Sequence, residues 1–191
     1  MRNYLESIEE GFVNSLNRIN FIFKNEIITT ECIKSYKGFK ILGDSFGPYE
    51  KGNKYKLKLF SAVPFIQNDI LRITQQEKCD NVDVQRYAIS ERDDQRLFHT
   101  NNNYFLSKIK EFKQFMIDDI RKKKKPQINL DRYNSYLLSI VDNRLLKLIK
   151  LAKTDLSLDD ERRLTISEKK LFDILFNLIK KWRNFFINNN T

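Results

Sequence analysis

The chain has 191 residues, of which 41% are hydrophobic, including fifteen phenylalanines and eight tyrosines. This apolar content is enough for a packed core and excludes global disorder, while no apolar run approaches the roughly 20 residues that cross a bilayer. The N-terminal sequence MRNYLESIEEGF contains acids and lacks the apolar segment of a signal peptide, so we expect a cytoplasmic protein. Cys32 and Cys79 lie outside any C-x-x-C pattern, which makes a structural disulfide improbable in a reducing compartment.

Positive charge is concentrated in the second half of the chain. The formal net charge is +10, and residues 101–191 contribute +9 of it, with 20 Lys and Arg against 11 Asp and Glu. Such asymmetry is typical of proteins that contact nucleic acid or an acidic partner. A lysine-rich helical surface exposed to solvent is an equally weighted interpretation.

The front of the chain combines an amphipathic helix with a strand-rich segment. Residues 21–42 are rich in Ile, Phe, Thr and Tyr, which favour strands. Three glycines and one proline between residues 43 and 52 then predict turns. The helix that precedes them is predicted from apolar residues at intervals of three and four, which are Leu5, Ile8, Phe12, Leu16 and Ile19.

A further strand completes a small β-rich module. Tyr55, Leu57 and Leu59 share one strand face, while the three intervening lysines face water. Pro64 can begin a short helix, and residues 70–73 can return as a strand. We therefore expect residues 1–76 to form an N-terminal helix and a β-rich domain.

Residues 77–191 are predicted to form a helical domain. The polar segment 74–103 connects the two modules and contains a helix over Val82–Leu97. Two stronger helical patterns follow, with apolar positions at Tyr104, Phe105, Ile109, Phe112, Met116 and Ile120, and at Leu130, Tyr133, Leu137, Ile140, Val141, Leu145, Leu148, Ile149 and Ala152. A third pattern ends the chain, and short connections predict that the three helices are antiparallel neighbours in a bundle. The expected fold class is α+β.

The last predicted helix, Thr165–Asn188, is apolar on two stripes. It begins with the capping box T-x-x-E at Thr165–Glu168. Its stripes are Phe172, Phe176, Ile179 and Phe186, and Leu171, Leu175, Leu178, Trp182 and Phe185. Such a helix is either central in a monomeric bundle or buries its second stripe on a partner. The candidate subunit-interface residues are Phe105, Phe112, Leu171, Leu175, Leu178, Trp182 and Phe185.

The sequence assigns no catalytic, metal or cofactor site. His99 is the single histidine, and with two distant cysteines it does not make a zinc site. The phosphate-binding loop and dinucleotide-binding glycine patterns are absent from the sequence. Three pairs of adjacent acids are interpreted as solvated: Asp93-Asp94, Asp118-Asp119 and Asp159-Asp160. An enzyme whose acids converge from different elements is the interpretation that the sequence supports least.

A run of five cations closes the helix that begins near residue 104. It is a candidate contact for non-specific DNA or an acidic partner. An exposed helix C-terminus, where cations suit the helix dipole, is the slightly favoured alternative. The residues are Arg121, Lys122, Lys123, Lys124 and Lys125.

The order of these features resembles the GINS family of replication proteins, and in particular its archaeal subunit type, in which a β-rich B domain precedes a helical A domain. The family's L-P-L-W-L-A segment is matched here after G-P-x-x-K-G (47–52), although Lys58 replaces its proline and Phe60 its tryptophan. Residues 101–112 and 142–152 resemble two of the family's helices. The matched positions also include Leu57, Leu59 and Ala62, and in the terminal helix, the closest match, Glu168, Leu171, Phe172, Trp182 and Arg183.

The resemblance covers residues 20–187 and implies a non-catalytic scaffold subunit of the GINS complex. It implies a 2:2 heterotetramer with the sister subunit whose B domain comes last, support of the MCM replicative helicase, and a link to a RecJ-like accessory protein. It further implies no cofactor, no membrane contact, a nucleoid-associated location and weak non-specific DNA binding at most. The alternative is a basic nucleic-acid-binding regulator, which would gather Lys and Arg on one face instead of exposing a large apolar stripe.

Overall fold

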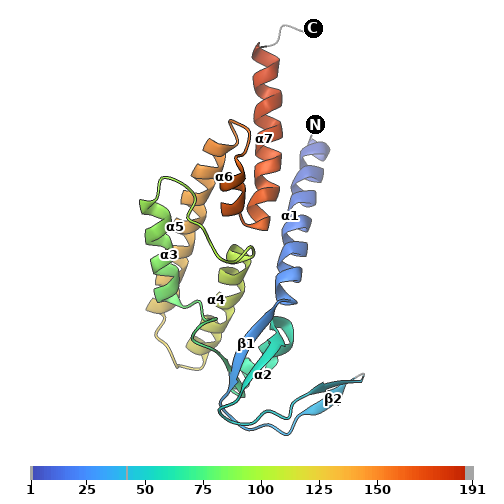
Figure 1. Ribbon diagram of the computed structural model, residues 1–191, viewed down its shortest axis with the longest axis vertical. Helices are drawn as coiled ribbons and strands as arrows, with labels where there is room; N and C mark the ends of the chain where they lie inside the picture. Colours follow the sequence, from blue (N-terminus) through green and yellow to red (C-terminus); the bar gives the residue numbers. More distant parts are fainter. Residues whose placement is uncertain (1, 42, 188–191) are drawn as a thin grey trace.

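The computed structural model describes residues 2–41 and 43–187, and it confirms the α+β class, with a small sheet preceding a helical region (Figure 1). None of the helices in these two ranges has the length and apolar character needed to cross a membrane. The elements in chain order are α1 (Arg2–Lys24), β1 (Ile27–Cys32), β2 (Phe39–Ile41), β3 (Asp44–Phe46), β4 (Lys54–Lys58), α2 (Leu59–Gln67), β5 (Leu71–Ile73), α3 (Asn81–Asp93), α4 (Phe105–Arg121), α5 (Ile128–Leu151), α6 (Leu158–Arg163) and α7 (Ile166–Ile187).

The central sheet has the strand order β4-β1-β5, and both pairs are antiparallel. The two faces predicted for β4 are confirmed, because Tyr55 and Leu57 are half-buried while the alternating lysines are exposed. Leu59 does not continue this strand. It begins α2, where it is almost fully buried, so the helix starts five residues before Pro64 instead of at it. Pro64 is tolerated inside α2 because it removes only one helical hydrogen bond.

Strands β2 and β3 form a separate hairpin, which extends to one side of the molecule (Figure 1). Gly38 and Gly47 face each other at its base, both with positive φ. A Cβ on Gly38 would lie 2.5 Å from the carbonyl oxygen of Phe46, and a Cβ on Gly47 would lie 2.8 Å from Cα of Gly38. Glycine is therefore required at both positions for the two chain segments to approach.

The first helix is longer than its predicted apolar stripe. Residues 21–24, expected to begin a strand, continue α1, because Phe23 carries the helical stripe one turn beyond Ile19 and is buried with it. Phe12 and Leu16 are half-buried, as predicted. Leu5 and Ile8 belong to the same prediction, but their side chains lie outside the described residues.

The helical region contains the predicted helices, with two differences in arrangement. Helix α3 packs along α5, and it ends at Asp93 rather than at Leu97 because the chain turns extended at Asp94. Helices α4 and α5 are antiparallel, as predicted. Helix α7 runs in the same direction as α5, because the short α6 reverses the chain between them (Figure 1). Its antiparallel neighbour is α1.

One hydrophobic core crosses the predicted boundary at residues 76/77. It joins Ile28 and Leu59 from the β-rich segment to Ile109 and Phe112 from α4. At the centre of this core, the hydroxyl of Tyr133 donates a hydrogen bond of 2.8 Å to the carbonyl oxygen of Ile109. The sheet therefore shares a core with the helices, while the hairpin side has its own smaller cluster around Phe65.

Candidate protein–protein interface

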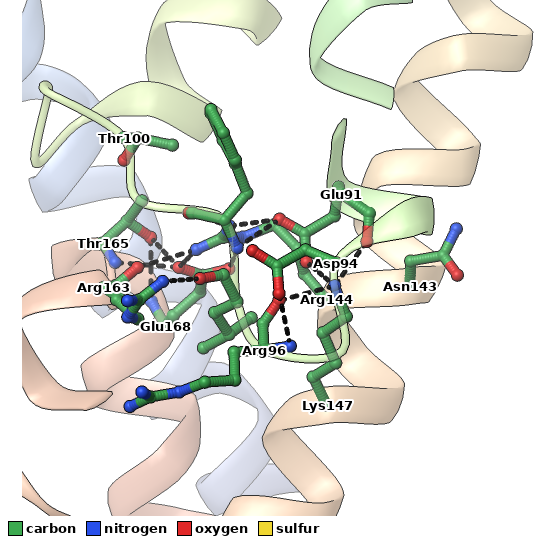
Figure 2. A network of polar contacts seen from close by, with 12 residues as sticks. Glu91, Asp94, Arg96, Thr100, Asn143, Arg144, Lys147, Arg163, Thr165 and Glu168 are labelled. Atoms are coloured by element: carbon green, nitrogen blue, oxygen red, sulfur yellow. Dashed lines mark hydrogen bonds and ion pairs between the residues drawn. The ribbon is translucent and has the colours of Figure 1, made fainter. Parts of the chain in front are cut away.

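The N-terminal end of α7 is fixed by a buried network of charged side chains, shown in Figure 2. Arg144 from α5 lies at its centre and is 1% exposed. Its guanidinium binds the Glu168 carboxylate through two hydrogen bonds of 2.5 and 2.8 Å, and Glu91 through one of 2.7 Å. Lys147 adds an ion pair of 2.5 Å to Glu91. The network thus joins α3, α5 and α7 with two cations and two anions.

All five N–H groups of the Arg144 guanidinium have acceptors. Beyond the two carboxylates, they donate to the carbonyl oxygens of Phe98 and Arg163, each at 3.0 Å. Burial acts to lower the pKa of Arg144, but hydrogen bonding and charge attraction to Glu168 and Glu91 outweigh it, so the pKa is raised. The arginine therefore stays charged, and each buried charge in the network has a partner.

The capping box predicted at the start of α7 is confirmed, and it is part of this network. The Thr165 backbone N–H donates to Glu168 Oε2 at 2.8 Å, and the Glu168 N–H donates to the Thr165 hydroxyl at 3.4 Å. Glu168 consequently accepts from its own helix start and from Arg144 at the same time. Arg144, Glu91 and Glu168 are at most 3% exposed and are paired with one another, so the network serves as a structural anchor.

The middle of α7 packs onto the end of α5. Phe172 is buried there in a cluster with Leu148 and Ala152, and Phe176 stacks on Phe172 at 5.7 Å between ring centroids. The candidate interface residues Leu171 and Leu175 are half-buried against the same cluster. Both predicted stripes of α7 are thus partly covered along the first half of the helix.

The last turns of α7 are apolar and uncovered, and they extend beyond the neighbouring helices (Figure 1). The ring of Phe186 packs against both Trp182 and Phe185, with ring centroids 5.1 and 5.0 Å apart. We call the exposed apolar residues at this end the α7 tip; they are 57–80% exposed and comprise Leu178, Trp182, Phe185, Phe186 and Ile187. A central position in a monomeric bundle is therefore wrong for this half of the helix. Asn188, the predicted end of the helix, lies outside the described residues.

Two of the predicted interface residues are not available to another chain. Phe105 and Phe112 are 5% and 4% exposed, because they lie on the side of α4 that faces the main core. Three others, Leu178, Trp182 and Phe185, lie in the α7 tip. The sequence pattern identified the apolar positions but could not indicate which side of each helix faces the core and which side faces solvent.

A second exposed apolar stripe lies on α5 and was missed. Apolar residues of this helix were predicted to share one face. Tyr133, Ile140 and Leu148 are buried, but Val141, Leu145 and Ile149, which were predicted with them, are exposed. The exposed stripe consists of Leu138, Val141, Leu145, Leu146 and Ile149. The number of apolar residues, too large for one face of a helix, was the available signal.

The basic run is largely paired within the chain. Lys122 and Lys124 both contact the Asp69 carboxylate, at 3.1 and 2.5 Å, and hydrogen bonding from Lys124 and then Lys122 lowers the pKa of Asp69. Arg121 lies 3.8 Å from Asp118, and Lys125 lies 3.0 Å from Asp119. Only Arg121 of the five is helical; Lys122 caps α4, and Lys123 adopts a positive φ of 56°.

The residues considered for catalysis do not converge. His99 is exposed, and within residues 2–41 and 43–187 no cluster of His, Cys, Asp or Glu is arranged to hold a metal ion. Asp159 and Asp160 bind Arg96 instead. Cys32 and Cys79 are free and buried.

No family model matches the chain, and no curated protein matches it.

Proposed function

We propose that this chain is a non-catalytic scaffold subunit of a GINS complex. The observation that carries the proposal is the α7 tip, where three aromatic rings and two aliphatic side chains are exposed together at the end of a firmly anchored helix. Monomeric proteins rarely leave such a contiguous apolar patch in water, and aromatic anchors of this kind are typical of interface centres.

Two further features support a scaffold. The exposed stripe on α5 offers a second apolar surface, so that more than one neighbour could be contacted. The residues that carry the resemblance to the GINS family also have structural roles, because segment 142–152 supplies Arg144 and Lys147 to the buried network and the terminal helix supplies Glu168. The proposed neighbours are the B-domain-last sister subunit in a 2:2 heterotetramer, the MCM helicase and a RecJ-like protein, in the nucleoid.

Affinity purification of the tagged chain from its source cells tests this proposal. We expect a sister subunit in a 1:1 mass-corrected ratio, and loss of that subunit when Trp182 and Phe185 are replaced by Ser. Leu158→Ser, which removes an exposed apolar side chain from α6, is the matched control and should leave the complex intact. Purified alone, the chain should self-associate; a monodisperse, heat-stable monomer by light scattering would count against the scaffold.

The alternative function, a basic nucleic-acid-binding regulator, loses support from the pairing of the basic run. We expect that replacing Lys122 to Lys125 with Gln lowers DNA retention only at low salt and leaves assembly intact. Non-specific binding of this type has a Kd of roughly 10⁻⁴–10⁻⁶ M at physiological salt. Tight, sequence-dependent binding at physiological salt that is abolished by these substitutions would favour the regulator instead.

A further inference from the structure

The hairpin β2–β3 and helix α2 enclose an open groove of about 700 Å³ on the β-rich side of the molecule. Its floor is Phe65, which is buried and packs against Tyr36 and Phe46. One wall is Phe39 and Ile41 from β2, and the facing wall is Phe60 from α2. We call this the hairpin groove.

The walls of the hairpin groove are preformed but not covered. Tyr36 and Tyr49 pair through two backbone hydrogen bonds of 2.8 Å, which fix the base of the hairpin over Phe65. Phe39 stacks on Phe46 across the two strands, with 5.4 Å between centroids. Even so, Phe39 and Phe60 remain 40% and 52% exposed, so both walls present apolar surface to an incoming chain.

The charge around the groove differs from that of the basic run on α4. Lys34 lines the groove, and Lys37 and Lys40 flank Phe39 in the chain. Among the described side chains, ion pairs involve none of these three lysines, whereas four of the five cations at residues 121–125 are paired. Among the described side chains, no carboxylate lines the groove, and the nearby Asp69 is already bound by Lys122 and Lys124.

We propose that the hairpin groove binds a short acidic peptide segment of a partner protein, with apolar side chains of the peptide between Phe39 and Phe60 and its carboxylates toward Lys34 and the neighbouring lysines. The uncompensated positive charge selects an acidic partner and disfavours a second copy of this chain, whose net charge is +10. Strand β2 also pairs only with β3 in the described residues, so its outer edge could extend the hairpin by one peptide strand.

Single-stranded nucleic acid fits this surface less well. Bases bind proteins by stacking on open aromatic faces, but Phe39 and Phe46 already stack on each other. Outside this stack Phe60 is an exposed ring, but Ile41, Pro64 and Ile70 offer no aromatic surface to a base. This site is separate from the α7 tip, so the proposal does not depend on membership of a GINS complex.

The test is a selection from a displayed library of short random peptides on the purified full chain. Enriched peptides should combine Asp or Glu with Phe, Leu or Trp, and their affinity should fall about tenfold with Phe60→Ser or Lys34→Glu. Matched controls are Phe21→Ser, an exposed ring on α1, and Lys170→Glu, an exposed cation on α7; both should bind as the native chain does. Both groove substitutions are at exposed positions, and unchanged thermal unfolding will verify that the variants remain folded.

Three results would overturn the proposal. The first is the absence of enriched peptides, or enrichment of peptides without acids. The second is peptide binding that survives Phe60→Ser and Lys34→Glu but is lost in Phe185→Ser, which would place the peptide on the α7 tip. The third is retention of a thymidine oligonucleotide that the same two groove substitutions abolish, which would make the groove a nucleic-acid site.

Discussion

The two ends of α7 differ in burial and in the contacts that their side chains make. The first turns hold Glu168 and Thr165 in a buried, hydrogen-bonded network with Arg144. In the last turns, Trp182 and Phe185 are 66% and 80% exposed. Apolar content alone therefore does not decide which part of a helix is buried. A helix that is anchored at one end can present an exposed apolar surface at the other end, and a subunit of an assembly requires such a surface.

The largest expected effect comes from removing the anchor of the first end. Arg144→Ala leaves Glu168 buried without its cation and Glu91 paired with Lys147 alone, and breaking a buried pair in this way typically costs about 3–5 kcal/mol. Urea denaturation should show a lower midpoint for Arg144→Ala. Arg92→Ala removes an exposed ion pair to Asp93 instead and should leave the midpoint nearly unchanged. Equal midpoints for the two variants would contradict the anchoring role of the network.

A second pair of variants compares two rings on the same helix. Phe172 is 6% exposed and Phe185 is 80% exposed. Phe172→Ala should destabilise the chain by about 3 kcal/mol through lost burial and a residual cavity. Phe185→Ala should leave the free energy of unfolding of the isolated chain almost unchanged but reduce subunit co-purification. If Phe185→Ala destabilised the monomer as much as Phe172→Ala, the tip would be packed within the chain.

Exposed ion pairs should contribute much less to stability than the buried network. Hydrogen bonds from Lys124 and Lys122 lower the pKa of Asp69 from its ordinary value of 3.8. A lowered pKa in the folded state gives stability that is present above pH 3.8 and is lost as the pH falls through the lowered value. The native chain should therefore lose slightly more stability below pH 4 than Asp69→Asn, and high salt should remove the difference. Identical acid unfolding of both chains would show that these contacts contribute nothing.

Local sequence signals predicted the elements of this fold well. Apolar residues spaced three and four positions apart located α1, α4, α5 and α7. The T-x-x-E pattern located the start of α7. Helix α3 was also found, although its end was misplaced. These features succeed because each depends on residues within a few positions of one another.

The predictions that failed concern which side of an element meets the rest of the chain. Glu91 and Glu168 lie 53 and 24 positions from Arg144, so no local pattern could indicate their network. Phe105 and Phe112 are as apolar as the residues of the α7 tip, and only the packing of α4 shows that they belong to the core. The hairpin groove was missed for the same reason, because its walls come from β2 and α2.

The fluorescence emission of Trp182 reports whether the α7 tip becomes buried on assembly, because Trp182 is the chain's single tryptophan and belongs to this tip. In the dilute isolated chain, we predict red-shifted fluorescence that acrylamide quenches readily. In the complex purified from source cells, with tryptophans of the co-purifying subunits replaced by Phe, the emission should shift to the blue and resist quenching. Blue-shifted, protected emission in the dilute monomer, or unchanged red emission in the complex, would contradict the account.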